Sequence, residues 1–129
     1  MYEQTEEAMT DTAIGVSQAD IELLEQLYTL RGRTEILQFL DQYPFLIPIL
    51  LEAPEKIRQY FPDSGLFLEV IPDPEIIDYV LLVLSILINF DPNDAVDRHN
   101  QMDLEWWLKN TTHEVRSKLI TLLEYPDEF

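Results

Sequence analysis

The sequence contains no cysteine, and it has only three glycines among its 129 residues. Without cysteine there can be no disulfide, no thiolate catalysis and no zinc or iron–sulfur site built on cysteine. The glycines are Gly15, Gly32 and Gly65, a spacing that forms neither a phosphate-binding glycine loop nor a dinucleotide fingerprint. No G-x-S-x-G motif is present either. Several common enzyme classes are therefore excluded.

Basic residues are also scarce, with 8 Lys and Arg against 25 Asp and Glu and a formal net charge of −17. Such an acidic surface repels phosphate, which disfavours binding to DNA, RNA or an anionic membrane. It favours cationic partners: a basic protein, a metal ion, or a protein surface that normally holds nucleic acid. Solubility alone is the competing explanation for this charge, because acidic surfaces keep proteins apart.

The sequence has no apolar stretch of the roughly 20 residues that a membrane-spanning helix needs. Its least polar run, Tyr79–Phe90 (YVLLVLSILINF), is shorter than that. The first twenty residues are acidic and lack the basic start and apolar centre of a signal peptide. We therefore expect a cytoplasmic protein, with residues 1–16 as a mobile acidic tail and residues 17–129 as a single domain.

Residues 17–62 are predicted to form the helical part of this domain. Ser17, with Asp20 three positions later, is typical of a helix start, and apolar residues at helical spacing continue from there. We expect this helix to end at Gly32, in the position after the C-cap. A second helix is predicted from Thr34 until Pro44 stops it.

A third helix is predicted in the segment PFLIPILLEAPEKIRQYFP, which is apolar but interrupted by prolines. Because a proline inside a helix deletes a hydrogen bond, we expect this helix to end near Glu52. A new start or a kink is expected at Pro54, and the segment closes at Pro62.

Residues 63–129 are predicted to form the sheet part, with strands at Leu66–Ile71 and Ser117–Tyr125. The run Tyr79–Phe90 can be a buried helix or a buried strand, since a fully apolar segment has no decisive period. Its β-branched residues, and the helix start at Asp91-Pro92 directly after it, favour a strand. A helix is expected from there to about Asn110, with Asp103 as a possible cap of a break within it.

These elements predict an α+β fold, in which N-terminal helices are followed by a small sheet in β-β-α-β order. The first two strands are close enough in sequence to pair antiparallel, and the strand after the helical crossover suits a parallel pairing. Since the run Tyr79–Phe90 is so apolar, we expect helices to cover both faces of the sheet.

The segments Tyr43–Ser64 (YPFLIPILLEAPEKIRQYFPDS), Leu66–Glu75 (LFLEVIPDPE) and Asp103–Leu108 (DLEWWL) resemble those of a group of small acidic cyanobacterial proteins of uncharacterised function. The resemblance covers roughly Leu40 to Tyr125. It implies a strand–strand–helix–strand layout and no known catalytic residues. It also implies an antitoxin-like or accessory role, since such small proteins accompany a second, toxin-like gene product.

Candidate residues for chemistry are few. His99 and His113 are the only histidines, and a metal site would need carboxylates such as Asp97, Asp103 or Glu105 around them. Such oxygen-rich surroundings suit zinc poorly, and no calcium-binding loop is present, so we predict no metal and no cofactor. Glu69 and Asp78 are the best candidates for a buried catalytic carboxylate, against the simpler roles of an outward-facing strand residue and a cap.

The pair Trp106-Trp107 is the strongest candidate for partner binding. Adjacent helical residues point about 100° apart, so we expect one tryptophan in the core and the other at its edge, flanked by Asp103 and Glu105. An aromatic ring beside carboxylates suits a cationic protein surface. The alternative is that both rings pack over the sheet, because tryptophan is mostly buried.

The sequence thus predicts a non-enzymatic, acidic interaction module that binds, and neutralises or regulates, a basic partner protein. One alternative is a nucleic-acid mimic that occupies a DNA- or RNA-binding cleft. A second is a small hydrolase or metal-dependent enzyme, which requires a concave pocket with a buried carboxylate. A third is a structural subunit of a homo-oligomer, which requires a large exposed apolar patch.

Overall fold

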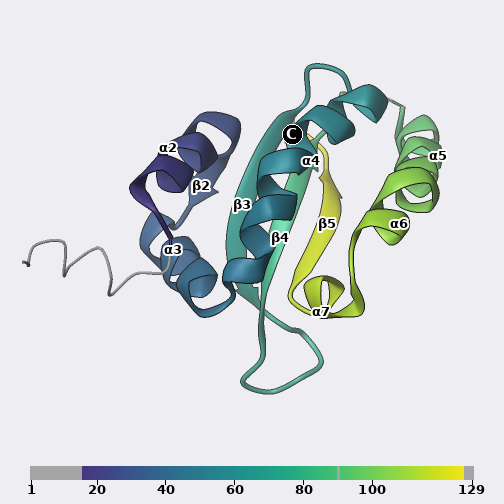
Figure 1. Ribbon diagram of the computed structural model, residues 1–129. Helices are drawn as coiled ribbons and strands as arrows, with labels where there is room; N and C mark the ends of the chain where they lie inside the picture. Colours follow the sequence, from purple (N-terminus) through teal and green to yellow (C-terminus); the bar gives the residue numbers. More distant parts are fainter. Residues whose placement is uncertain (1–15, 90, 127–129) are drawn as a thin grey trace, which may run out of the picture.

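A computed structural model of the chain describes residues 16–89 and 91–126, and the predicted acidic tail lies almost wholly outside them. The described part has an α+β fold, as the sequence predicted (Figure 1). In chain order its elements are α2 (Gln18–Leu27), β2 (Thr29–Arg31), α3 (Arg33–Gln42), η1 (Pro44–Leu46), α4 (Ile47–Tyr60), β3 (Gly65–Pro72), β4 (Val80–Leu87), α5 (Pro92–Met102), η2 (Asp103–Trp107), α6 (Leu108–Asn110), α7 (His113–Arg116) and β5 (Leu119–Glu124).

The sheet has four strands in the order β2-β3-β4-β5. The three predicted strands are all present, and the apolar run is a strand, β4, as its β-branched residues indicated. β4 pairs antiparallel with β3 and parallel with β5, as expected. The predicted β-β-α-β order is incomplete, because β2 precedes these elements and joins the sheet parallel to β3.

Strand β2 overturns the predicted end of the first helix. Helix α2 begins after the N-cap Ser17, as expected, but it ends at Leu27 because Thr29–Arg31 pairs with Phe67–Glu69 of β3. Gly32 is therefore not a helix C-terminal residue. It is the N-cap of α3, and its left-handed backbone (φ 89°) turns the chain from β2 into that helix.

The predicted break at Pro54 is also wrong, because α4 runs unbroken from Ile47 to Tyr60. Proline has no N–H to give to the carbonyl four residues earlier, which here belongs to Leu50. The hydroxyl of Tyr28, at the C-terminal end of α2, donates a 2.6 Å hydrogen bond to that carbonyl oxygen. A side chain from another helix thus replaces the hydrogen bond that Pro54 cannot make, which explains why the helix continues.

The helix after β4 starts as predicted, with the Asp91 side chain accepting hydrogen bonds from the amides of Asn93 and Asp94. It does not break at Asp103. Instead the chain changes there into a π-helical turn, η2, and continues as α6. A short helix, α7, capped by Thr112, then leads into β5.

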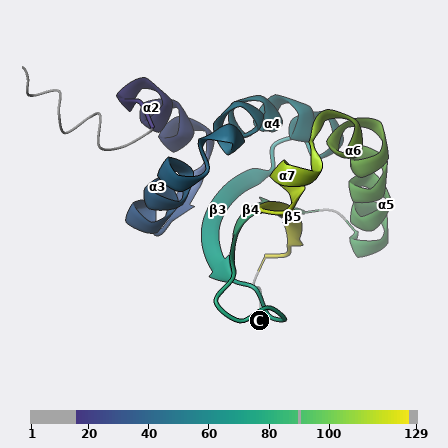
Figure 2. The same ribbon diagram turned by 60° about the horizontal axis from the view of Figure 1, so that its bottom comes forward.

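The expectation that helices cover both faces of the sheet is wrong. Leu66, Leu68, Leu82, Leu84 and Leu119 point to one face, and they form a single buried cluster with residues from α2, α3, α4, α5, η2 and α7. Figure 2 shows the helices gathered on this side of the sheet. The opposite face, the open face, carries residues that alternate with these along the strands.

The open face is protected by its own side chains. Arg31 of β2 lies across it, with its guanidinium 4.1 Å from the centre of the Phe67 ring, and makes two 2.9 Å hydrogen bonds to the carboxylate of Glu124 on β5. Glu69 of β3 lies 4.0 Å from the same guanidinium. This arrangement explains how Val83 of β4 stays buried there without a helix over it.

Candidate interaction surface

Carboxylates dominate the surface of the described residues. They lie on each of the long helices α2, α3, α4 and α5 and in the loops between elements. The exposed ones are Glu22, Glu25, Glu35, Asp41, Glu52, Glu55, Asp63, Glu75, Asp78, Asp91, Asp94, Asp97, Glu105 and Glu114.

The cationic side chains, in contrast, are mostly paired with groups of the protein itself. Arg31 and Arg33 pair with Glu124 and Glu25, and Arg98 pairs with Asp94. Three others bond to backbone oxygens or lie over aromatic rings: Arg58 to Ser64, Arg116 to Thr111, and Lys118 over Tyr43 and Tyr79. Six of the 8 cations are thus held by this protein's own groups, and the negative charge of the remaining surface carboxylates is largely uncompensated.

The predicted partner-binding residues lie together on η2, but both tryptophans are buried. Trp106 is 5% exposed and Trp107 is 6% exposed, so the expectation that one ring lies at the edge of the core is wrong. The π-turn is the physical reason. It contains more residues per turn than an α-helix, so adjacent side chains are separated by a smaller angle about the helix axis and both rings point toward the core. The rings contact each other, with centroids 5.7 Å apart, and belong to the core.

The two carboxylates of the predicted set differ in their surroundings. Glu105 is exposed, and it accepts hydrogen bonds from the Tyr60 hydroxyl (2.7 Å) and the Gln101 amide (3.1 Å). These two hydrogen bonds lower the pKa of Glu105, so it stays ionised at neutral pH. Next to it, Leu104 and Leu108 are 66% and 50% exposed. The apolar contact that the tryptophans cannot offer is therefore available from these leucines.

Asp103 is partly buried, and burial raises the pKa of its carboxyl while the nearby His99 opposes that shift. Its Oδ1 and the Nε1 of Trp106 are buried without a hydrogen-bond partner among the described residues. His99 itself bonds through Nε2 to the Thr121 hydroxyl at 2.9 Å, which ties α5 to β5. Asp103 is thus the carboxylate closest to the enzyme hypothesis, a residue that the sequence indicated as a cap, as a partner contact and as one carboxylate of a metal site.

The carboxylates that the sequence favoured for chemistry do not lie in apolar surroundings. Asp78 is exposed in the loop before β4, and the Glu69 side chain on the open face is 47% exposed. Glu69 therefore has the simpler role of an outward-facing strand residue, whereas Asp78 precedes a strand and caps no helix. Within residues 16–89 and 91–126, no group of three or more His, Asp or Glu side chains could hold a metal ion.

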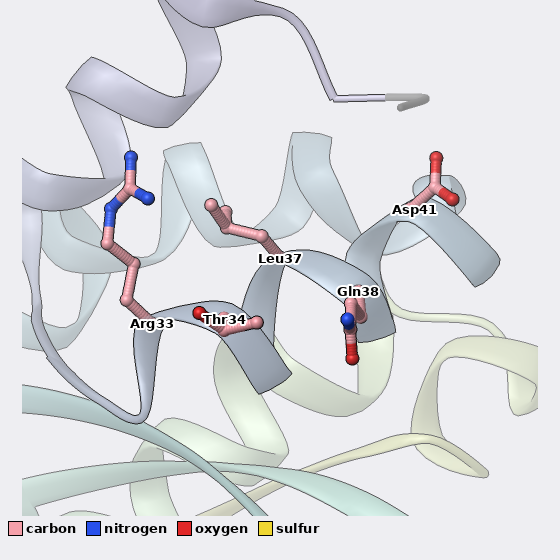
Figure 3. Close-up of a pocket in the computed structure, with 5 residues that line it drawn as sticks. All are labelled: Arg33, Thr34, Leu37, Gln38 and Asp41. Atoms are coloured by element: carbon pink, nitrogen blue, oxygen red, sulfur yellow. The ribbon is translucent and has the colours of Figure 1, made fainter. Parts of the chain in front are cut away.

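A pocket of about 260 Å³ lies along the outer side of α3 (Figure 3). It is lined by Arg33, Thr34, Leu37, Gln38 and Asp41, with Arg33 and Asp41 toward its two ends. Since the described residues of this lining all belong to one helix, and Arg33 already pairs with Glu25, they do not form the convergent set of polar groups that is typical of an active site.

No helix in the described ranges combines the length and the apolar character that crossing a membrane requires. Comparison of the chain with protein-family models, with curated proteins and with solved structures found no match. The resemblance to small acidic cyanobacterial proteins therefore stays a prediction from the sequence.

Proposed function

We propose that this protein is a non-enzymatic acidic interaction module that binds a basic protein and regulates or neutralises it. The observation that carries the proposal is the imbalance of the surface: the few cations are mostly paired with groups of this protein, whereas many carboxylates of the helices and loops face solvent. A net charge of −17 on a domain of this size attracts cationic surfaces and accelerates their association.

The same charge selects the class of partner. Nucleic acids and anionic bilayers are repelled by it, whereas the cationic side chains of a basic protein are attracted. Charge alone gives fast association rather than long residence, which needs apolar anchors at the centre of the contact. Leu104 and Leu108, next to the ionised Glu105, are one exposed apolar group that fits this role.

The first test is a pull-down from an extract of the native cells with the full chain, at about 0.05 M and about 0.5 M salt. A basic protein that is retained at low salt and released at high salt supports the proposal. Failure to retain any basic protein at either salt overturns it. A retained partner that duplex DNA or RNA displaces from the complex identifies a nucleic-acid mimic instead.

Two double variants that each remove two negative charges distinguish long-range electrostatic attraction from direct contact with the partner. Asp97→Asn with Glu105→Gln neutralises the α5–η2 side, and Glu22→Gln with Glu35→Gln neutralises the α2–α3 side. If the whole field steers the partner, both variants slow association to a similar extent, because each removes the same charge. If the α5–η2 side touches the partner, only the first also accelerates dissociation, as measured by surface plasmon resonance with the purified partner.

A further inference from the structure

The loop that joins β3 to β4, residues 73–79, exposes two isoleucines. Ile77 is 89% exposed and Ile76 is 53% exposed, although isoleucine is among the residues most often fully buried. Val80, at the start of β4, is also exposed. Figures 1 and 2 both show this loop extending beyond the ends of the strands, away from the helices. The isoleucines thus form an apolar projection.

The loop is held in this shape by its own hydrogen bonds. The Asp73 side chain accepts from the amides of Glu75 (2.7 Å) and Ile76 (3.0 Å). Across the base of the loop, the Asp73 amide donates to the Tyr79 carbonyl at 2.7 Å. Asp78 takes up a left-handed backbone (φ 63°), which directs the chain back into β4. A contact made by this loop would therefore cost less conformational entropy than one made by an unstructured segment.

The base of the loop is anchored to the rest of the fold through Tyr79. Its hydroxyl donates to the carbonyl of Ser117, and the ammonium group of Lys118 lies 4.0 Å from the centre of its ring. Both partners belong to the turn between α7 and β5. The loop that contains Ile76 and Ile77 is consequently held in place at its base.

The charges around the isoleucines decide what can cover them. Asp73, Glu75 and Asp78 flank the pair on both sides in sequence, and residues 73–79 include no cation. These carboxylates oppose insertion into an anionic bilayer, and they oppose a second copy of this chain, which carries the same charge. They complement an apolar pocket with cationic residues at its edge.

We propose that the loop 73–79 is the apolar anchor of this protein, and that Ile76 and Ile77 insert into an apolar pocket, edged by Lys or Arg, on a basic partner protein. This inference rests on the proposed function and adds to it the contact that gives residence time. The carboxylates of Asp73, Glu75 and Asp78 meet the cationic edge of the pocket, and the isoleucines fill its interior.

The test places a photoreactive benzoylphenylalanine at Ile77 in the full chain and, in a separate variant, at Leu104, the competing exposed apolar position. After irradiation in native cell extract at low salt, we expect an adduct from position 77 whose attachment site lies in an apolar segment of a basic protein, next to Lys or Arg. An adduct with a second copy of the chain, with lipid, or only from position 104 overturns the proposal.

The second measurement uses substitutions. Ile77→Ser and Ile76→Ser should leave the melting temperature unchanged, because both side chains are already exposed in the free protein. Each should weaken binding of the purified partner at least tenfold. If the partner binds with its salt dependence intact and the serine variants bind as well as the parent chain, the anchor is refuted while the interaction module stands. If no basic partner is retained at all, both proposals fail.

Discussion

The hydrogen bond from Tyr28 to the Leu50 carbonyl is the contact whose removal tests most directly how this fold tolerates its prolines. Tyr28→Phe keeps the aromatic ring in the core, where the residue is 4% exposed, and deletes only the hydroxyl. Burial raises the pKa of this phenol, against the opposing charge of Arg58, so the hydroxyl remains a donor throughout the accessible pH range. The substitution therefore removes one donor and leaves one carbonyl without a partner.

The loss of stability expected for Tyr28→Phe follows from the position of the Leu50 carbonyl. Pro54 lies four residues after Leu50, so no helical N–H can take over when the hydroxyl is removed. Leaving a buried acceptor unsatisfied costs about 1–3 kcal/mol. For a domain of this length, each kcal/mol lowers the melting temperature by about 4 °C. Tyr60→Phe is the matched control: it deletes a hydroxyl that bonds to the exposed Glu105, and surface changes of this kind cost about 0.5 kcal/mol or less.

A second substitution, at Pro54, tests whether Tyr28 and Pro54 are energetically coupled. Pro54→Ala supplies an N–H that can bond to the Leu50 carbonyl, so in that background Tyr28→Phe should cost at least about 1 kcal/mol less than it does in the parent chain. The assay is urea unfolding of the four proteins of the cycle, followed by circular dichroism. An equal cost in both backgrounds would refute the idea that Tyr28 replaces the bond that Pro54 cannot make.

Three further predictions concern charge and burial. Glu124→Gln breaks the bidentate ion pair on the open face and should lower the free energy of unfolding at neutral pH by about 1 kcal/mol or less, with Glu69→Gln as the weaker control. The ion pair lowers the pKa of Glu124, so its contribution to stability is present above the unfolded pKa and lost as the pH falls through the folded pKa. Urea titrations of the variant and the parent chain should therefore converge at pH values below the folded pKa. The raised pKa of Asp103 has the opposite effect on stability, because burial penalises the charged form of this carboxyl in the folded state. Asp103→Asn should therefore raise the melting temperature at pH 7, and a gain that does not shrink toward pH 4 would contradict this reasoning. Trp107→Ala should cost about 3–5 kcal/mol in urea unfolding, whereas the exposed Leu104→Ala should cost about 0.5 kcal/mol or less, and similar costs would contradict the burial described for the pair.

Much of the fold could be predicted from local sequence. The strand assignment of β4 followed from its β-branched residues and from the helix start at Asp91-Pro92, and both signals act within a few residues. Strand β2 could not be found in this way, since its three residues lie within an apolar helical pattern and it forms only through pairing with β3. Gly32 was misassigned as the end of the first helix because glycine suits either end of a helix.

The candidate site was predictable to a smaller extent. Negative charge on the surface follows from composition, but its lack of compensation depends on where Arg31 and Lys118 lie in three dimensions. The burial of both tryptophans depends on the π-turn at Asp103, which no residue type signals. The isoleucines at positions 76 and 77 had a readable signal, because Asp73-Pro74-Glu75 before them and Asp78 after them indicate a turn, a place where apolar side chains become exposed.

The parallel pairing of β4 with β5 has a consequence for the order in which the chain can fold during synthesis. The register joins Leu82 to Leu119 and Leu87 to Glu124, so β4 remains an unprotected edge strand until residues 119–124 have left the ribosome. An apolar edge of this kind invites pairing with other chains. Arg31 likewise waits for Glu124, 93 residues later, before its charge is paired. Nascent chains halted between β4 and β5 should therefore be the species most prone to aggregate and most dependent on chaperones.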